Sequence, residues 1–371
     1  MTSKKLIVIT AITALILVLG LFFLAALIWD SNVISFDKVG ARTEKAFEVG
    51  RVTANKLEPE PPEIIIVAVG DIMLSRVVEQ KMLEHKNFNY PFLKTADYLK
   101  SADLAFGNLE TAIMAGRIIK TGEIVFRSDP KATEVLKDNN FQIVSLANNH
   151  TPNFGEKGLK DTFEYLNKAD ILYVGAGENL AQARTPKYTK INDIKIAWLA
   201  RTEQLYAPDN YAAGAKSAGT AFWNKEEILS AVAEAKKQAD VVFVSMHAGT
   251  EYADEPTEDK MAFARTAIKA GAEIVIGHHP HVVQMAEKYQ GKYIFYSLGN
   301  FIFDQMWSKE TREGLALKIT LTKTGIKQIV ATPILIEDFC QPRILNDGEG
   351  EGIVERLGLE TDKGAEGYII K

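Results

Sequence analysis

The chain has 371 residues, of which 47% are hydrophobic and 25% charged, so it can bury a sizeable core and is not disordered as a whole. Its net charge is −5 and no basic block is present, which excludes a general nucleic-acid-binding role. An anionic substrate would therefore need a local cationic site or a metal ion. The single cysteine, Cys340, allows no internal disulfide and is compatible with an exported or a cytosolic domain.

The first segment predicts a membrane anchor. Residues 6–29 are almost entirely apolar and exceed the roughly 20 residues needed to cross the hydrocarbon core. The alternatives are a cleaved signal peptide, whose apolar core is shorter at about 7–15 residues, and a buried core helix, which would show a polar face. Lys4 and Lys5 precede the span, so the positive-inside rule predicts residues 1–5 in the cytoplasm. Everything after Asp30 is then outside, on a single-pass protein of the cell membrane.

The remainder predicts a stalk, a main domain and a tail. Residues 30–62 carry mixed charges and end in a proline-rich run, which favours an extended stalk. In residues 63–337, short β-branched runs alternate with helical patterns, an order typical of an α/β domain. Strands are expected at 64–69, 103–106, 142–146, 171–174, 194–199, 241–245, 273–276 and 293–297, and helices at 130–139, 156–168, 225–238 and 259–270.

The end of the main domain follows a different pattern. Residues 314–321 and 327–336 predict two paired strands around a short turn at 323–325. Beyond them, residues 338–371 mix glycines with acidic residues, so the sequence leaves the structure of this tail poorly defined.

Polar and metal-binding side chains follow several of the expected strands, and strand carboxyl ends are where α/β sheets build their sites. Five of the six histidines, all but His85, lie at these ends. Imidazole together with carboxylate suits Zn, Mn or Fe. On an extended segment His279 and His281 would face the same way. Taken singly, Asp71 is equally typical of a helix cap and Asn149 of a left-handed turn, but clustered imidazoles have little structural use.

Five motifs at these positions resemble the bacterial capsule-synthesis family of the CapA type. They are Val69–Met73, Gly107–Thr111, Ser145–His150, Gly277–Val282 and Tyr296–Phe301. The resemblance runs from about Ile64 to Asp304 and implies a role in poly-γ-glutamate assembly or export. The implied partners are the membrane, subunits of a capsule polymer synthase and an anionic polymer.

That family is similar to calcineurin-like metallophosphoesterases, which implies a two-sheet sandwich flanked by helices, here preceded by one transmembrane helix. The resemblance further implies His150 as the catalytic residue facing the scissile bond. The implied metal ligands are Asp71, Glu110 or Asn108, Asn149, His247, His279 and His281. Met73 stands where a histidine usually follows the first aspartate by two, and Asn108 where a bridging aspartate is expected. Both departures predict weak occupancy of a second metal position.

Three functions compete at this point. The first is a metal-dependent hydrolase of a phosphoester or related bond at the outer membrane face, with one or two divalent ions and His150 protonating the leaving group. The second is a non-catalytic accessory subunit that binds nascent poly-γ-glutamate or a membrane synthase complex. The third is an amide-bond hydrolase or transferase that acts on the polymer with the same metal. Residue chemistry favours the metal and the resemblance favours the capsule role, so whether the chain is an enzyme stays open.

Overall fold

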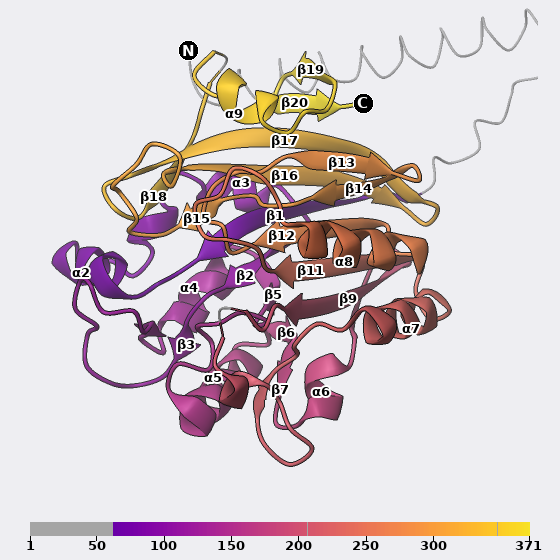
Figure 1. The fold of residues 1–371 in the computed structure, drawn as a ribbon. Coiled ribbons are helices and arrows are strands. Elements are labelled where there is room, and N and C mark those ends of the chain that lie inside the picture. Colours follow the sequence, from indigo (N-terminus) through magenta and orange to yellow (C-terminus); the bar gives the residue numbers. More distant parts are fainter. Residues whose placement is uncertain (1–61, 206, 347) are drawn as a thin grey trace, which may run out of the picture. The chain divides into compact units, whose positions relative to one another are not determined.

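The structure of the protein is a computed structural model that describes residues 62–205, 207–346 and 348–371 (Figure 1). The expected tail 1–5, the expected span 6–29 and all but the last residue of the expected stalk 30–62 lie outside these residues. Among the residues that are described, no helix is long and apolar enough to cross a membrane.

The larger sheet has ten strands and a parallel centre. In order across the sheet, eight of them are β19 (Thr361–Gly364), β20 (Gly367–Ile370), β17 (Gly325–Glu337), β16 (Glu313–Thr322), β1 (Ile64–Ile72), β2 (Leu104–Leu109), β5 (Phe141–Ser145) and β6 (Leu172–Val174). The other two are β15 (Asn300–Ile302), beside β1, and β18 (Gln341–Ile344), beside β17. β1, β2, β5 and β6 are parallel, whereas β16 and β17 form the antiparallel pair that the sequence predicted.

The smaller sheet has six strands. In order they are β13 (Ala286–Tyr289), β14 (Lys292–Phe295), β12 (Ile274–His278), β11 (Val241–His247), β9 (Ile194–Thr202) and β8 (Lys187–Ile191). The four central strands are parallel and the two edge strands antiparallel. Two short ladders pair β3 (Ala112–Ile113) with β4 (Arg127–Ser128) and β7 (Ala176–Gly177) with β10 (Gly219–Thr220).

All four helices expected from the sequence are present. They are α4 (Ala132–Asp138), α5 (Gly155–Lys168), α7 (Lys225–Lys236) and α8 (Glu258–Lys269). The side chains of Asn224 and Thr257 cap α7 and α8 by accepting a hydrogen bond from the backbone N–H three residues further on. The structure adds α2 (Arg76–Glu84), α3 (Ala96–Lys100), α6 (Leu180–Arg184), α9 (Glu351–Glu355) and the 3₁₀ turns Tyr90–Phe92 and Asp209–Tyr211.

The core lies in layers because successive side chains of each strand point to opposite faces. On β1, Ile66 and Ala68 join an apolar cluster shared with Trp198 of the smaller sheet, so the two sheets pack against each other. Val67 and Val69 point the other way, into a cluster with side chains of α2 and α5. The outer face of the smaller sheet packs against α7 and α8. The described chain is therefore a mixed α/β fold with helices outside and two sheets between them.

The segment beyond Glu337, whose structure the sequence left poorly defined, belongs to this fold. β18 and β20 both pair antiparallel with β17, and β19 pairs with β20. Ile353, Leu357 and Ile370 are buried in the cluster between the sheets. Glycines and acidic residues separate these few apolar positions, so no periodic pattern marks them in the sequence. Their burial depends on β17, and the domain expected at 63–337 accordingly extends to β20.

Candidate metal centre

Strand register brings the expected polar residues together. In the larger sheet Asp71 lies opposite Asn108 of β2 on one side and Asn300 of β15 on the other. In the smaller sheet His247, the last residue of β11, lies opposite His278, the last residue of β12. Because these strands are parallel, their carboxyl ends share one edge of each sheet.

β1 was expected to end at Gly70, but it continues to Ile72. A Cβ atom at position 70 would lie 1.9 Å from the carbonyl oxygen of Gly299, so only glycine lets the chain at the start of β15 pass this close. The backbone N–H of Asp71 then donates to the Gly299 carbonyl at 3.1 Å. The glycine thus marks a close approach of two strands and sets the position of Asp71.

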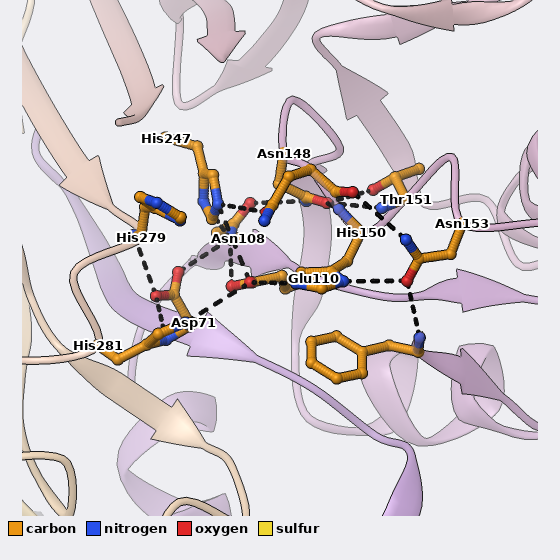
Figure 2. Close-up of polar contacts among 12 residues, drawn as sticks. Asp71, Asn108, Glu110, Asn148, His150, Thr151, Asn153, His247, His279 and His281 are labelled. Carbon is orange, nitrogen blue, oxygen red and sulfur yellow. Dashed lines mark hydrogen bonds and ion pairs between the residues drawn. The ribbon is translucent and has the colours of Figure 1, made fainter. Parts of the chain in front are cut away.

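Asp71 is fully buried and surrounded by donors (Figure 2). Its Oδ1 accepts a hydrogen bond from Asn108 Nδ2 at 2.8 Å and lies 3.2 Å from His278 Nδ1. Its Oδ2 accepts from the backbone N–H of His279 at 3.2 Å and lies 3.4 Å from His281 Nδ1. Burial opposes ionisation, but His278 and His281 outweigh it and hold the pKa of the Asp71 carboxyl well below its usual range.

Glu110 lies at the centre of the imidazoles (Figure 2). The side chain is fully buried, and its Oε1 has no hydrogen-bond partner among the described residues. That oxygen lies 3.8 Å from His150 Nε2 and 3.9 Å from the Nε2 atoms of His247 and His281. Burial, and then the charge of Asp71, raise the pKa of the Glu110 carboxyl well above its usual range. A buried oxygen with three imidazole nitrogens just beyond hydrogen-bond distance is suited to sharing a cation with them.

Asn108 links the carboxylates through a neutral amide. Its Nδ2 donates to Asp71 Oδ1 at 2.8 Å and to Glu110 Oε2 at 3.4 Å, and lies 3.1 Å from His247 Nδ1. Its Oδ1 accepts from Asn148 Nδ2 at 3.0 Å. Because the Asn148 side-chain oxygen already accepts two backbone N–H groups, the orientation of both amides is fixed. Asn108 therefore turns its nitrogen, and not its oxygen, toward the carboxylates.

His247 and Asn149, both expected as metal ligands, are bonded to each other. His247 Nε2 lies 2.9 Å from Asn149 Oδ1, and its Nδ1 faces the Asn108 amide nitrogen. Burial, and then the charge of His279, hold the pKa of His247 well below its usual range, so the ring is neutral at neutral pH. Neutral imidazole is the form that ligates metals. To bind a cation, however, His247 and Asn149 would have to give up the hydrogen bond that they make to each other.

His150 faces Glu110 through one defined nitrogen. Its Nδ1 lies 3.0 Å from Asn153 Oδ1, an oxygen that also accepts from the backbone N–H of Phe126 at 2.8 Å. Asn153 Nδ2 donates to Tyr211 Oη at 3.3 Å, which fixes the amide orientation and assigns the imidazole proton to Nδ1. The Nε2 lone pair therefore faces Glu110, and the ring stacks on Phe126 with centroids 3.9 Å apart. Burial lowers the pKa of His150 to about 3.

His279 and His281 converge, but not by the expected route. Their φ angles are +94° and +60°, so the segment is left-handed where an extended one was expected. The His279 ring nevertheless lies 4.7 Å from the His247 ring and 6.1 Å from the His281 ring, centroid to centroid. One ligand atom each from Asp71, Glu110 and His281 lie within 4.8 Å of one another, the spacing of a possible cation site.

Several residues near the centre were not selected from the sequence. His278 faces Asp71, and Glu251 forms a second group with His279 and His281 at the same 4.8 Å spacing. Glu251 follows β11 by four residues, and this closeness to His247 was the one signal available for it. Met73, at the position of the missing histidine, is buried in the apolar core, and its Sδ accepts from the backbone N–H of Ser75 at 3.1 Å.

A cleft of about 540 Å³ opens beside the centre. His150, His281 and Glu251 lie on its wall. The rest of its lining is largely apolar and includes Ile124, Phe126, Tyr252, Met306, Trp307 and Phe339. Arg76 also lines the cleft, but Asp304 pairs with its guanidinium.

Comparison of the sequence with known proteins shows the family to which the chain belongs. Residues 65–305 match the family described as "Bacterial capsule synthesis protein PGA_cap". The "PGA biosynthesis protein CapA" of Bacillus subtilis (strain 168) is 35% identical over 302 residues, covering 80% of this chain and 78% of that protein. The "Capsule biosynthesis protein CapA" of Bacillus anthracis is 32% identical over 314 residues, covering 82% and 75%. With a match over most of the domain and relatives above 30% identity, the chain belongs to the PGA_cap family of bacterial capsule synthesis proteins.

Proposed function

We propose that this chain is a membrane-anchored, exported protein of poly-γ-glutamate capsule synthesis or export, with a metal-dependent hydrolase-type site in its main domain. The names of the Bacillus relatives support the capsule role. The apolar run at 6–29, with Lys4 and Lys5 before it, supports the anchor. Protease added to intact cells stripped of their wall should digest the main domain, and complete protection would contradict the topology.

The observation that carries the metal proposal is the buried Glu110 Oε1 between three imidazole nitrogens at 3.8–3.9 Å. Two atoms that each lie about 2.0–2.2 Å from one cation are separated by about 3–4 Å, so these distances fit a shared divalent ion. Asp71, Glu110 and His281 would hold it, joined by His247, His279 and Asn149. Carboxylate and imidazole together suit Mn, Zn or Fe.

A divalent ion in this position would lower the pKa of a bound water and polarise a substrate oxygen. The side chains of the protein supply the rest. His150 lies on the cleft wall, and Asn153 and Phe126 fix its ring with Nε2 unprotonated, so this nitrogen would first accept a proton at the reacting bond and then return it to the leaving group. The apolar cleft wall excludes water from the reacting bond. We favour a phosphoester as the substrate bond, because a divalent ion would polarise its oxygens.

The decisive experiment measures metal content and hydrolysis together. The full-length protein in detergent is assayed for bound metal and for turnover of a generic phosphodiester and of poly-γ-glutamate. His281→Ala should lose the metal and the activity. His85→Ala is the matched control, because His85 is exposed and stacks on Tyr90 away from the candidate centre. A wild-type protein without metal and without turnover would instead favour the accessory subunit that binds the polymer or a synthase complex.

A further inference from the structure

The loop after β11 brings a third carboxylate to the centre. Ligand atoms of Glu251, His279 and His281 lie within 4.8 Å of one another, as do those of Asp71, Glu110 and His281. The two groups share His281. Glu251 also lines the cleft, whereas Asp71 and Glu110 are fully buried. The shared imidazole therefore has buried carboxylates in one group and a cleft-side carboxylate in the other.

The backbone holds this loop against the histidine segment. The N–H of Ala248 donates to the carbonyl of His278 at 3.2 Å, and the N–H of Tyr252 donates to the carbonyl of Pro280 at 2.8 Å. Gly249 and Tyr252 have φ angles of +100° and +62°, which tighten the turn between these two bonds. Glu251 lies directly before the second bond, so its position is tied to that of the histidines.

The hydrogen bonds of His281 show how many cations its imidazole can bind. Its Nδ1 lies 2.9 Å from Asn300 Oδ1. Asn300 Nδ2 donates to Gln305 Oε1 at 3.0 Å and to the carbonyl of Thr311 at 2.9 Å, so the asparagine oxygen must face the ring. His281 therefore carries its proton on Nδ1 and offers only Nε2 as a ligand. One lone pair serves one ion, so a cation on this nitrogen has the members of both groups as its candidate ligands.

We infer that Glu251 is an exchangeable ligand of this cation, bound from the cleft side and replaced by the anionic group of the substrate. This inference rests on the proposed metal site. Glu251 supplies the oxygen that Asn108 cannot, because the Asn108 amide turns its nitrogen toward the carboxylates. Its place on the cleft wall is also where an incoming phosphoryl oxygen would arrive. Replacing one anionic oxygen by another keeps the charge around the cation balanced while substrate binds.

The test uses the full-length protein, with Mn²⁺ alone as the first probe and inorganic phosphate as the second. Glu251→Gln should weaken Mn²⁺ binding at least about tenfold in calorimetry, because loss of even an outer partner of a ligand typically costs 10–100-fold in affinity. Glu255→Gln removes the same charge from the same loop and should leave the affinity unchanged. Glu251→Asp keeps the carboxylate on a shorter side chain and should give an intermediate value.

The second probe separates an exchangeable ligand from a structural one. With Mn²⁺ saturating, Glu251→Gln should bind phosphate at least as tightly as the wild type, because the competing carboxylate is gone. Equal Mn²⁺ affinity in wild type and Glu251→Gln would overturn the inference and leave the proposed site standing. Parallel loss of Mn²⁺ and phosphate affinity would also overturn it, since Glu251 would then only support the loop. A wild type that binds no Mn²⁺ would instead overturn the proposed function.

Discussion

Replacing Glu110 by glutamine should have opposite effects on stability with and without metal. In chelator, the raised pKa of the buried Glu110 carboxyl means that the folded state binds its proton more tightly than the unfolded state. Its contribution to stability is therefore complete below the ordinary value of 4.5 and is lost as pH rises through the folded pKa. The loss accumulates at about 1.4 kcal/mol per pH unit above 4.5, so at pH 7 it cannot exceed about 3.5 kcal/mol. Glu110→Gln lacks this penalty and should melt a few degrees higher than wild type in chelator.

Added metal should reverse the order. Mn²⁺ at about 100 times its dissociation constant stabilises the wild type by about 2.7 kcal/mol, a rise in Tm of roughly 5 °C for a domain of this size. Glu110→Gln, without its central ligand, should show little of that rise. Differential scanning calorimetry in EDTA and in Mn²⁺ measures both effects.

Glu79→Gln is the matched control for this experiment. Glu79 is also buried, but it accepts two hydrogen bonds from Arg127 at 2.7 Å. Its replacement should therefore lower Tm equally in both buffers. If Glu110→Gln also lowers Tm in EDTA and keeps the full metal-induced rise, the carboxylate serves the fold and the reasoning fails.

Three further changes test separate parts of the centre. His150→Ala should keep the metal and lose about 10²–10⁴-fold in turnover, measured by metal analysis beside steady-state kinetics; equal activity would remove His150 from the mechanism. Asn108→Asp should lower Tm in EDTA and tighten Mn²⁺ binding, because a third buried carboxylate joins Asp71 and Glu110; calorimetry would contradict this by showing unchanged affinity. Lys260 is buried beside the histidine segment, where its Nζ donates to the carbonyl of His278 at 3.4 Å. Burial lowers its pKa to about 7, so the wild type should gain stability above that pH, because the unfolded lysine keeps its proton. Chemical denaturation in EDTA should give about 2 kcal/mol more gain between about pH 7 and 9 for wild type than for Lys260→Met, and equal slopes would refute the argument.

The sequence predicted the strands and main helices well because their signals are local. β1, α7 and α8 follow from short β-branched runs and from helical periodicity, and the structure adds their caps at Asn224 and Thr257. Gly70 was read as the end of a strand, although it allows the close passage of Gly299 and the strand continues. The role of such a glycine depends on a partner more than 200 residues away, which no local pattern contains.

The candidate centre could likewise be predicted only in part. Histidines at strand ends could be recognised in the sequence, and parallel register brings His247 beside His278 and Asp71 beside Asn108. The direction in which each imidazole ring points could not be predicted. The left-handed backbone at His279 breaks the pattern in which alternate side chains of an extended segment point to the same side. Glu251 was missed for a related reason, since its loop is positioned by hydrogen bonds to the histidine segment.

Asn108 connects the stability of the domain with the number of cations it holds. An aspartate at this position would place a third buried negative charge beside Asp71 and Glu110, and a second cation would be needed to balance it. The Asn108 amide instead donates to both carboxylates, so the centre can fold before metal arrives. Met73, packed in the core, removes a further ligand of a second position. With Nδ1 of His281 held by its proton, the remaining donors point to one cation whose last protein ligand comes from the cleft.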